Sequence, residues 1–212
     1  MTEISLPETP LATATLEYAI RLETPAVANH SVRSFLFATL YADRQGIELD
    51  RDVSTELLFC ATVLHDLGLT EPGNGKKRFE VDGADLAAQF LTEKGLSRAD
   101  VDAVWDAIAL HTSFGITEHK GPLCALTYGG IMLDFGHTTE FIPDDVAAAI
   151  HAEYPRHQMA KSLADIIVAQ AKQNEEKAPR FSITADLLRQ RGDDAAAVTD
   201  MEELARMGRW GN

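Results

Sequence analysis

The sequence contains few cysteines, and neither is placed for a disulfide framework. Cys60 and Cys124 each lie in an apolar stretch, LLFCATV and PLCALTY. Two buried thiols that are far apart in the chain suit a reducing compartment better than a disulfide-stabilised scaffold. We therefore expect a fold stabilised by packing alone.

Membrane and secretion signals are also lacking. No apolar run approaches the roughly 20 residues that a transmembrane helix needs. The N-terminal stretch MTEISLPETPLATATLEY has neither the basic segment nor the apolar run of a signal peptide. The expectation is a cytoplasmic protein that does not enter a membrane.

Positive charge is scarce. The 212 residues include 19 basic and 33 acidic side chains, which gives a net charge of −14 at pH 7. A surface this acidic repels phosphate backbones, so nucleic-acid binding is not expected. A small anionic substrate is still compatible with the sequence, because a bound divalent metal can dominate the local field.

Helix-forming residues dominate what is present. Ala, Leu, Glu, Asp and Gln recur and long β-branched runs are absent, so the composition favours helix. Residues 1–10, which include two prolines, are expected to form a loose arm. No repeat or linker divides the rest, so residues 11–212 are predicted to form a single all-α domain.

Helix boundaries are indicated by caps and glycines. Thr24-Pro25 is typical of a helix start, Gly46 and Gly68 of helix ends, and Asp50 is a candidate cap for the helix between these glycines. Near the C-terminus, the apolar face of SLADIIVAQ fits either a core or a subunit interface. A homo-oligomer is therefore compatible with the sequence.

The most informative feature is the pair His65-Asp66, at the C-terminal end of an apolar helix that closes with Gly68. A histidine beside an aspartate offers a metal one borderline nitrogen and one hard oxygen. Taken alone, such a pair is more often a satisfied polar pair or a helix cap.

Three other apolar segments each carry one further metal-capable residue. His30 lies in VANHSVRSFLFATLY, His111 ends AVWDAIALHTS, and Asp134 lies in GGIMLDFGH. A carboxylate in such a run is costly to bury unless it is paired or bound to a metal. Four segments that each bring such a residue inward indicate one shared site.

This ordered set of residues resembles the HD-domain metal-dependent phosphohydrolase superfamily. The phrases NHSVRSF, ATVLHDLGLT and RFEVDGA are similar, more narrowly, to the cyanamide hydratase branch of HD-domain proteins. The resemblance covers about residues 25–175 and implies an all-α bundle that binds one divalent ion. The ligands it implies are His30, His65, Asp66 and Asp134. Zinc is the expected metal, with Fe²⁺, Mn²⁺ and Ni²⁺ as alternatives, and a second metal would involve His111.

What the resemblance implies about function is an enzyme that performs water chemistry on a small molecule. The leading hypothesis is a hydratase, in which a metal-bound water attacks the nitrile carbon of cyanamide to give urea. In this hypothesis Asp66 steers the proton of the water and His111 delivers a proton or binds substrate. Arg78, Glu80 and His137 are the candidate substrate contacts.

Two alternatives are left open by the sequence. A phosphohydrolase acting on a nucleotide or another phosphate ester requires basic residues at the mouth of the site, for which the candidates are Arg33, Lys76, Lys77 and Arg78. A non-catalytic helical regulator requires a structural metal with a closed coordination sphere. The glycine- and lysine-rich segment 69–83 lacks the complete P-loop pattern. It is expected to be a flexible surface loop and is a candidate lid over the site.

Overall fold

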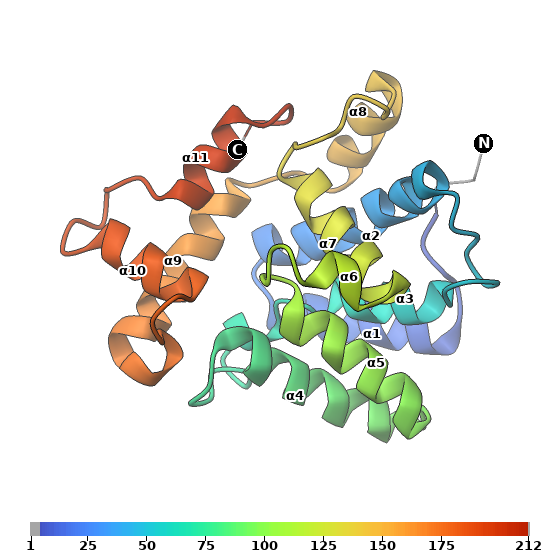
Figure 1. The fold of residues 1–212 in the computed structure, drawn as a ribbon, viewed down its shortest axis with the longest axis horizontal. Coiled ribbons are helices and arrows are strands. Elements are labelled where there is room, and N and C mark those ends of the chain that lie inside the picture. The colour runs from blue at the N-terminus through green and yellow to red at the C-terminus, as the bar shows by residue number, and fades with distance from the viewer. Residues whose placement is uncertain (1–4, 212) are drawn as a thin grey trace.

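The computed structural model describes residues 5–211, and this part of the chain folds into helices without a β-strand (Figure 1). Its elements are, in order, α1 (Pro10–Leu22), α2 (Pro25–Gln45), α3 (Thr55–Val63), the 3₁₀ helix η1 (Leu67–Leu69), α4 (Phe79–Glu93), α5 (Arg98–Leu110), α6 (Thr117–Lys120), α7 (Pro122–Asp134), α8 (Asp144–Glu153), α9 (Met159–Gln173), the 3₁₀ helix η2 (Glu175–Lys177), α10 (Ile183–Arg191) and α11 (Asp200–Met207). The all-α prediction is confirmed. A search of these helices found none with the length and apolar character that a bilayer span demands.

The predicted boundaries of α2 agree with the structure, and those of α3 do not. Gly68 was expected to end the helix that carries His65-Asp66, but α3 ends at Val63 and Gly68 lies inside η1. Thr24 caps α2, and Gly46 ends it in the left-handed region with φ of 69°. The prediction that Asp50 caps α3 is wrong, because Ser54 does so. Asp50 adopts a left-handed φ of 64°, and its carboxylate instead accepts the Thr55 N–H at 2.9 Å, one residue past the cap.

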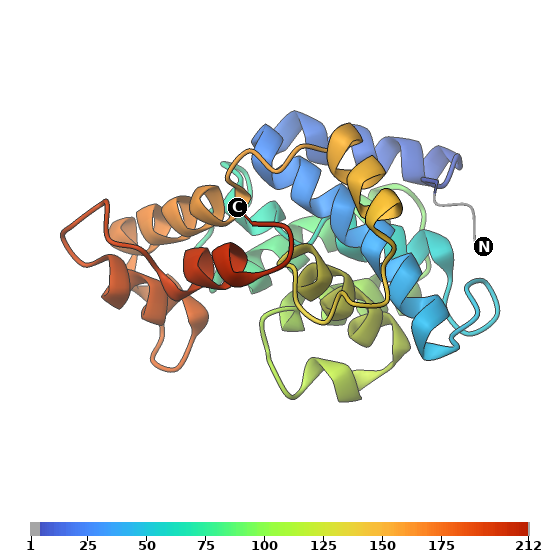
Figure 2. The same ribbon diagram turned by 90° about the horizontal axis from the view of Figure 1, so that it is seen from above.

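The helices form two groups, each with its own apolar cluster. We call α1–α8 the core bundle and α9–α11 the C-terminal helices. The C-terminal helices lie together at one side of the core bundle in both views (Figures 1 and 2). Their cluster joins Leu163, Ile167 and Leu187 to Ile131 of α7 and to Phe135, which follows α7. The apolar face of SLADIIVAQ is therefore packed against this chain's own helices.

Two glycines allow the close approaches that shape the site. A Cβ atom at Gly130 would lie 2.1 Å from the Ser34 carbonyl oxygen, so only glycine lets α7 cross α2 this tightly. A Cβ atom at Gly68 would lie 1.9 Å from the Phe79 carbonyl oxygen, where η1 meets α4. The sequence phrases HDLGLT and RFEVDGA thus touch each other in the fold.

The segment between η1 and α4 is attached to the C-terminal helices. The Lys177 ammonium, 1% exposed, donates to Asp82 Oδ2 at 2.9 Å and to the Gly75 carbonyl at 3.4 Å. Asp82 also accepts the Lys77 N–H at 3.2 Å. A buried ion pair that the sequence did not reveal thus ties this segment to η2, and the flexibility of its exposed part stays a prediction.

Candidate metal centre

Three buried side chains converge where α2 passes the end of α3. His30, His65 and Asp66 each offer a donor atom, and these atoms lie within 4.8 Å of one another. His65 Nε2 is 3.1 Å and His30 Nε2 3.9 Å from Asp66 Oδ2, yet this oxygen makes no hydrogen bond. A buried carboxylate oxygen without a partner, facing two imidazole nitrogens, fits the donor set of a divalent metal.

All three imidazoles of the site are fixed through their Nδ1 atoms. Each Nδ1 donates a hydrogen bond of 2.6 or 2.7 Å to a buried oxygen: His30 to Asp134 Oδ2, His65 to the Thr62 carbonyl and His111 to the Ile108 carbonyl. A neutral ring protonated at Nδ1 presents its Nε2 lone pair to the site. This is the tautomer that a metal ligand or a proton acceptor requires.

His111 stands beside the three-residue cluster without belonging to it. Its Nε2 is 3.9 Å from Asp66 Oδ1, and its ring meets the His65 ring edge-on at 4.9 Å. Burial lowers the pKa of His111 to about 4, and the nearby His65 adds to this effect. His111 is therefore neutral at pH 7, and its unprotonated Nε2 faces Asp66.

Asp134 lies behind His30, on the Nδ1 side of the ring. Arg33 donates to both of its oxygens, at 2.7 and 2.8 Å, and Arg156 Nη1 approaches Oδ1 at 3.2 Å. Burial acts to raise the pKa of Asp134, but Arg33 and His30 together bring it well below its usual range. Asp134 is thus outside the three-residue cluster and orients His30, and its direct coordination of a metal stays a prediction.

The candidate substrate contacts make structural hydrogen bonds. Glu80 is fully buried and accepts from Arg78 Nη2 and from the Thr112 hydroxyl, each at 2.5 Å. His137 Nε2 donates to the Leu204 carbonyl at 3.2 Å, which links the core bundle to α11. None of Arg78, Glu80 and His137 lines the cavity at the cluster, and their contact with substrate stays a prediction.

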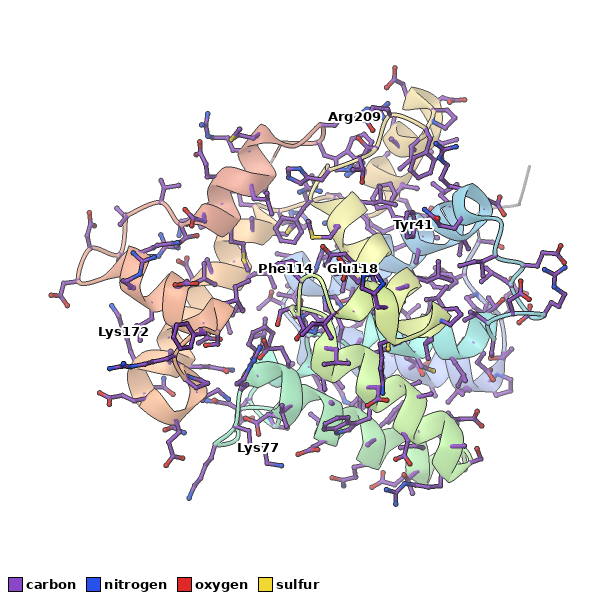
Figure 3. The ribbon with its side chains drawn as sticks, in the orientation of Figure 1. Tyr41, Lys77, Phe114, Glu118, Lys172 and Arg209 are labelled. Atoms are coloured by element: carbon purple, nitrogen blue, oxygen red, sulfur yellow. The ribbon has the colours of Figure 1, made fainter. Side chains whose placement is uncertain are left out.

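A cavity of about 280 Å³ opens onto the cluster, between the core bundle and the C-terminal helices. His30, His65, Asp66 and His111 form one end of it. Most of its wall is apolar and comes from Phe79, Ile131, Met132, Phe135, Leu163, Ile167, Ile183, Leu187, Met201 and Leu204. Phe114, 56% exposed, contributes from the loop before α6, on the side that faces the C-terminal helices (Figure 3).

Within residues 5–211, no lysine or arginine lines this cavity. Arg33 was a candidate for phosphate binding, but it is fully buried and uses its donors on Asp134 and on the carbonyls of Tyr154 and Pro155. Of the segment 69–83, only Phe79, the first residue of α4, lines the cavity, and a lid role for this segment stays a prediction. The cover is formed by the C-terminal helices.

Sequence reasoning missed Arg156, whose Nη1 donates to the Asp134 carbonyl at 2.8 Å. No sequence pattern indicated this contact, because Arg156 reaches the site from the connection between α8 and α9. The contact of Arg33 with Asp134 had a signal: Arg33 follows His30 by three residues and projects from a similar helix face. Both arginines contact a carboxylate that the sequence indicated only as buried, and Arg33, together with His30, lowers the pKa of Asp134.

The comparisons with known proteins agree with this geometry. A family model described as "HD domain" matches residues 27–173. Over 165 residues the chain is 28% identical to each of two Saccharomyces cerevisiae proteins, the cyanamide hydratases DDI2 and DDI3, covering 76% of this chain and 72% of each relative. HD domains bind divalent metals, and the three-residue cluster supplies suitable donors. As the order of its metal-capable residues predicted, the chain belongs to the HD domain family of metal-dependent hydrolases and hydratases.

Proposed function

We propose that this protein adds water to the nitrile carbon of a small uncharged molecule, with cyanamide, which becomes urea, as the leading candidate. The observation that carries the proposal is the cavity. It presents histidines and an aspartate at one end, and among its described lining residues it offers no cation to a phosphate. The similarity to two cyanamide hydratases supports the choice of substrate.

The residues at the cluster have separate roles in this reaction. A divalent cation bound by His30, His65 and Asp66 would supply a water whose pKa is lowered from about 15.7 towards about 7. Asp134 orients His30 through its Nδ1–H. Zinc is the ion we propose, because histidine nitrogens with a carboxylate oxygen suit it.

His111 is the proposed proton carrier. Its neutral Nε2 faces the cluster and can accept a proton from the attacking water, then return it to the nitrile nitrogen. The water oxygen bonds to the nitrile carbon, and the resulting isourea tautomerises to urea. The apolar wall limits the access of bulk water during these proton transfers.

Phosphate-ester hydrolysis is less well supported. Phosphate recognition relies on arginine, lysine or backbone donors directed at the anion. The basic side chains near the site have other partners, since Lys77 pairs with Asp85 and Arg78 with Glu80. Asp186 and Asp200 add negative charge to the cavity lining. A purely structural metal is disfavoured as well, because a cavity opens directly onto the donors.

The test is urea formation from cyanamide by purified, zinc-loaded protein. His65→Ala serves as the blank, and His119→Ala, an exposed histidine outside the site, serves as the matched control. We expect urea from the wild type and from His119→Ala, and none from His65→Ala. Metal-loaded wild type that forms no urea above the blank would refute the proposal, and phosphate release from a nucleotide panel would then identify the alternative.

A further inference from the structure

The cavity is larger than cyanamide requires. Its volume is about 280 Å³, whereas one water takes up about 30 Å³ of liquid. Pockets for drug-sized ligands begin at about 300 Å³. Cyanamide, with one carbon and two nitrogens, fills only the end beside the imidazoles. The remaining space extends towards the C-terminal helices and accommodates several more atoms.

The surface of this additional space is apolar. Ile131 of α7, Leu163 and Ile167 of α9 and Leu187 of α10 line it and are otherwise buried. A cavity holds ordered water well only where polar groups offer it two or more hydrogen bonds. These side chains offer none, so an apolar occupant is favoured over water.

This apolar surface is continuous with the reactive end. The Phe135 ring meets the His30 ring edge-on at 5.7 Å, and the Phe79 ring meets the His111 ring edge-on at 5.6 Å. Both phenylalanines line the cavity. A substrate whose reacting carbon lies at His30 and His111 therefore extends directly onto apolar side chains.

The polar groups at the other end do not suit an anionic substituent. Gln190 and Asp200 bind each other: the Gln190 amide donates to Asp200 Oδ2 at 2.5 Å, and the Asp200 N–H donates to Gln190 Oε1 at 2.8 Å. This pair joins α10 to α11. The charges of the lining beyond the histidine cluster are the carboxylates of Asp200 and Asp186, and Arg189 Nη2 lies 3.6 Å from Asp186 Oδ1. An anionic substituent would meet repulsion there.

We infer that the substrate of this site is an uncharged nitrile or substituted cyanamide that carries an apolar group about the size of a butyl chain. This inference rests on the proposed hydratase function and specifies its substrate class. For an alkylcyanamide, R–NH–C≡N and H₂O give R–NH–CO–NH₂. A carbon–oxygen double bond forms as the carbon–nitrogen triple bond becomes a single bond. The two O–H bonds of water break, and both protons end on the former nitrile nitrogen.

The kinetic test compares kcat/KM for cyanamide and n-butylcyanamide on the zinc-loaded protein. Each methylene buried on the apolar wall contributes roughly fourfold to binding. We expect kcat/KM to be at least about tenfold higher for n-butylcyanamide, since ordering the chain offsets part of this gain. Hydration of cyanamide with no gain, or with a loss, for the butyl compound would overturn the inference and leave the proposed function standing.

Leu204→Trp tests the position of the apolar group. Leu204 is a half-buried wall residue of α11, and an indole there fills part of the cavity. We expect the ratio of kcat/KM for the butyl compound to that for cyanamide to fall at least tenfold. Met207→Trp, on the same helix but 72% exposed and outside the cavity, is the matched control and leaves this ratio unchanged. Ile183→Trp, also half-buried in the wall, replaces Leu204→Trp if melting curves show that the latter is unfolded.

Binding of the products provides a readout without turnover. Titration calorimetry with n-butylurea and with urea should show at least tenfold tighter binding of n-butylurea, reduced in Leu204→Trp. If neither cyanamide is hydrated but n-butylurea binds with this preference, the proposed reaction fails and the apolar specificity of the cavity stands. Equal affinity for both ureas would overturn the inference whatever the turnover result.

Discussion

The core bundle and the C-terminal helices contribute different kinds of side chain to the same cavity. The core bundle supplies its histidines and Asp66, backed by a layer of paired charges in which Arg33 is fully buried against Asp134. The C-terminal helices supply mainly aliphatic side chains, such as Leu163 and Leu187. Reaction chemistry is thus concentrated in the core bundle, whereas both regions contribute to the apolar wall, since Phe79, Ile131 and Met132 belong to the core bundle.

The two regions also differ in how strictly the orientation of their side chains is fixed. At the cluster, each imidazole donates a hydrogen bond from its Nδ1 to a buried oxygen. This bond fixes the orientation of the ring and the direction of its Nε2. The C-terminal helices line the cavity mainly with aliphatic side chains, whose packing tolerates changes of size and shape more readily. Substitutions in the core bundle should therefore abolish chemistry, and those in the C-terminal helices should alter which substrates are accepted.

The largest effect is expected from removing a donor of the cluster. His65→Ala and Asp66→Asn should lose the metal and all measurable turnover. Ligand binding to the folded state stabilises it by about 4 kcal/mol at a thousandfold excess over Kd, so the increase in Tm on adding zinc should disappear as well. Metal content after desalting and melting curves with and without zinc measure this. Full metal occupancy in both variants would contradict the assignment, and His119→Ala is the control.

His111→Ala should separate catalysis from metal binding within the core bundle. We expect the metal to be retained, because His111 lies outside the three-residue cluster. Turnover should fall about 100- to 10,000-fold, the usual contribution of general acid–base catalysis. Loss of metal from this variant, measured in the same desalted samples, would instead make His111 a ligand.

Lys177→Met tests the attachment of the C-terminal helices to the core bundle. The Lys177 and Asp82 side chains are 2% and 9% exposed, so removing the ammonium leaves a buried carboxylate without its partner. We expect the free energy of unfolding to fall by about 3–5 kcal/mol, measured by denaturant titration. Lys172→Met is the matched control: Lys172 is exposed and donates to the Gly192 carbonyl at 2.8 Å (Figure 3), so its loss should cost less than about 1 kcal/mol. Equal losses in the two variants would refute a special role for the buried pair.

The smallest effect is expected from pH acting on the cluster. Burial by itself lowers the pKa of His65, but the Asp66 carboxylate raises it above its usual 6.5. A metal must displace the proton from His65, so apparent zinc affinity should fall as the pH drops through and below this pKa, by roughly tenfold per unit. Competition with a chelator of known affinity between about pH 8 and 6 measures the slope. A constant affinity over this range would show that His65 binds zinc without losing a proton.

Much of the core bundle was predictable from sequence because its signals are local. The caps of α2 and the positions of the glycines follow from residues only a few positions apart. Asp50 shows the limit of such signals: its side chain accepts the N–H of Thr55, the first residue of α3, but the N-cap is Ser54. Hydrophobic periodicity likewise identified the apolar face of α9 but did not reveal which surface it covers.

By itself, the sequence determined the all-α fold class, the HD family and the types of metal-capable residue with their order along the chain. These depend on helix propensity, periodicity and short motifs, which act within a few residues. The tertiary structure decided that Asp134 faces His30 Nδ1 and Arg33, that Arg156 joins them, and that the C-terminal helices enclose an apolar cavity. Such contacts join residues up to about a hundred positions apart, and they depend on how helices cross, which periodicity does not specify.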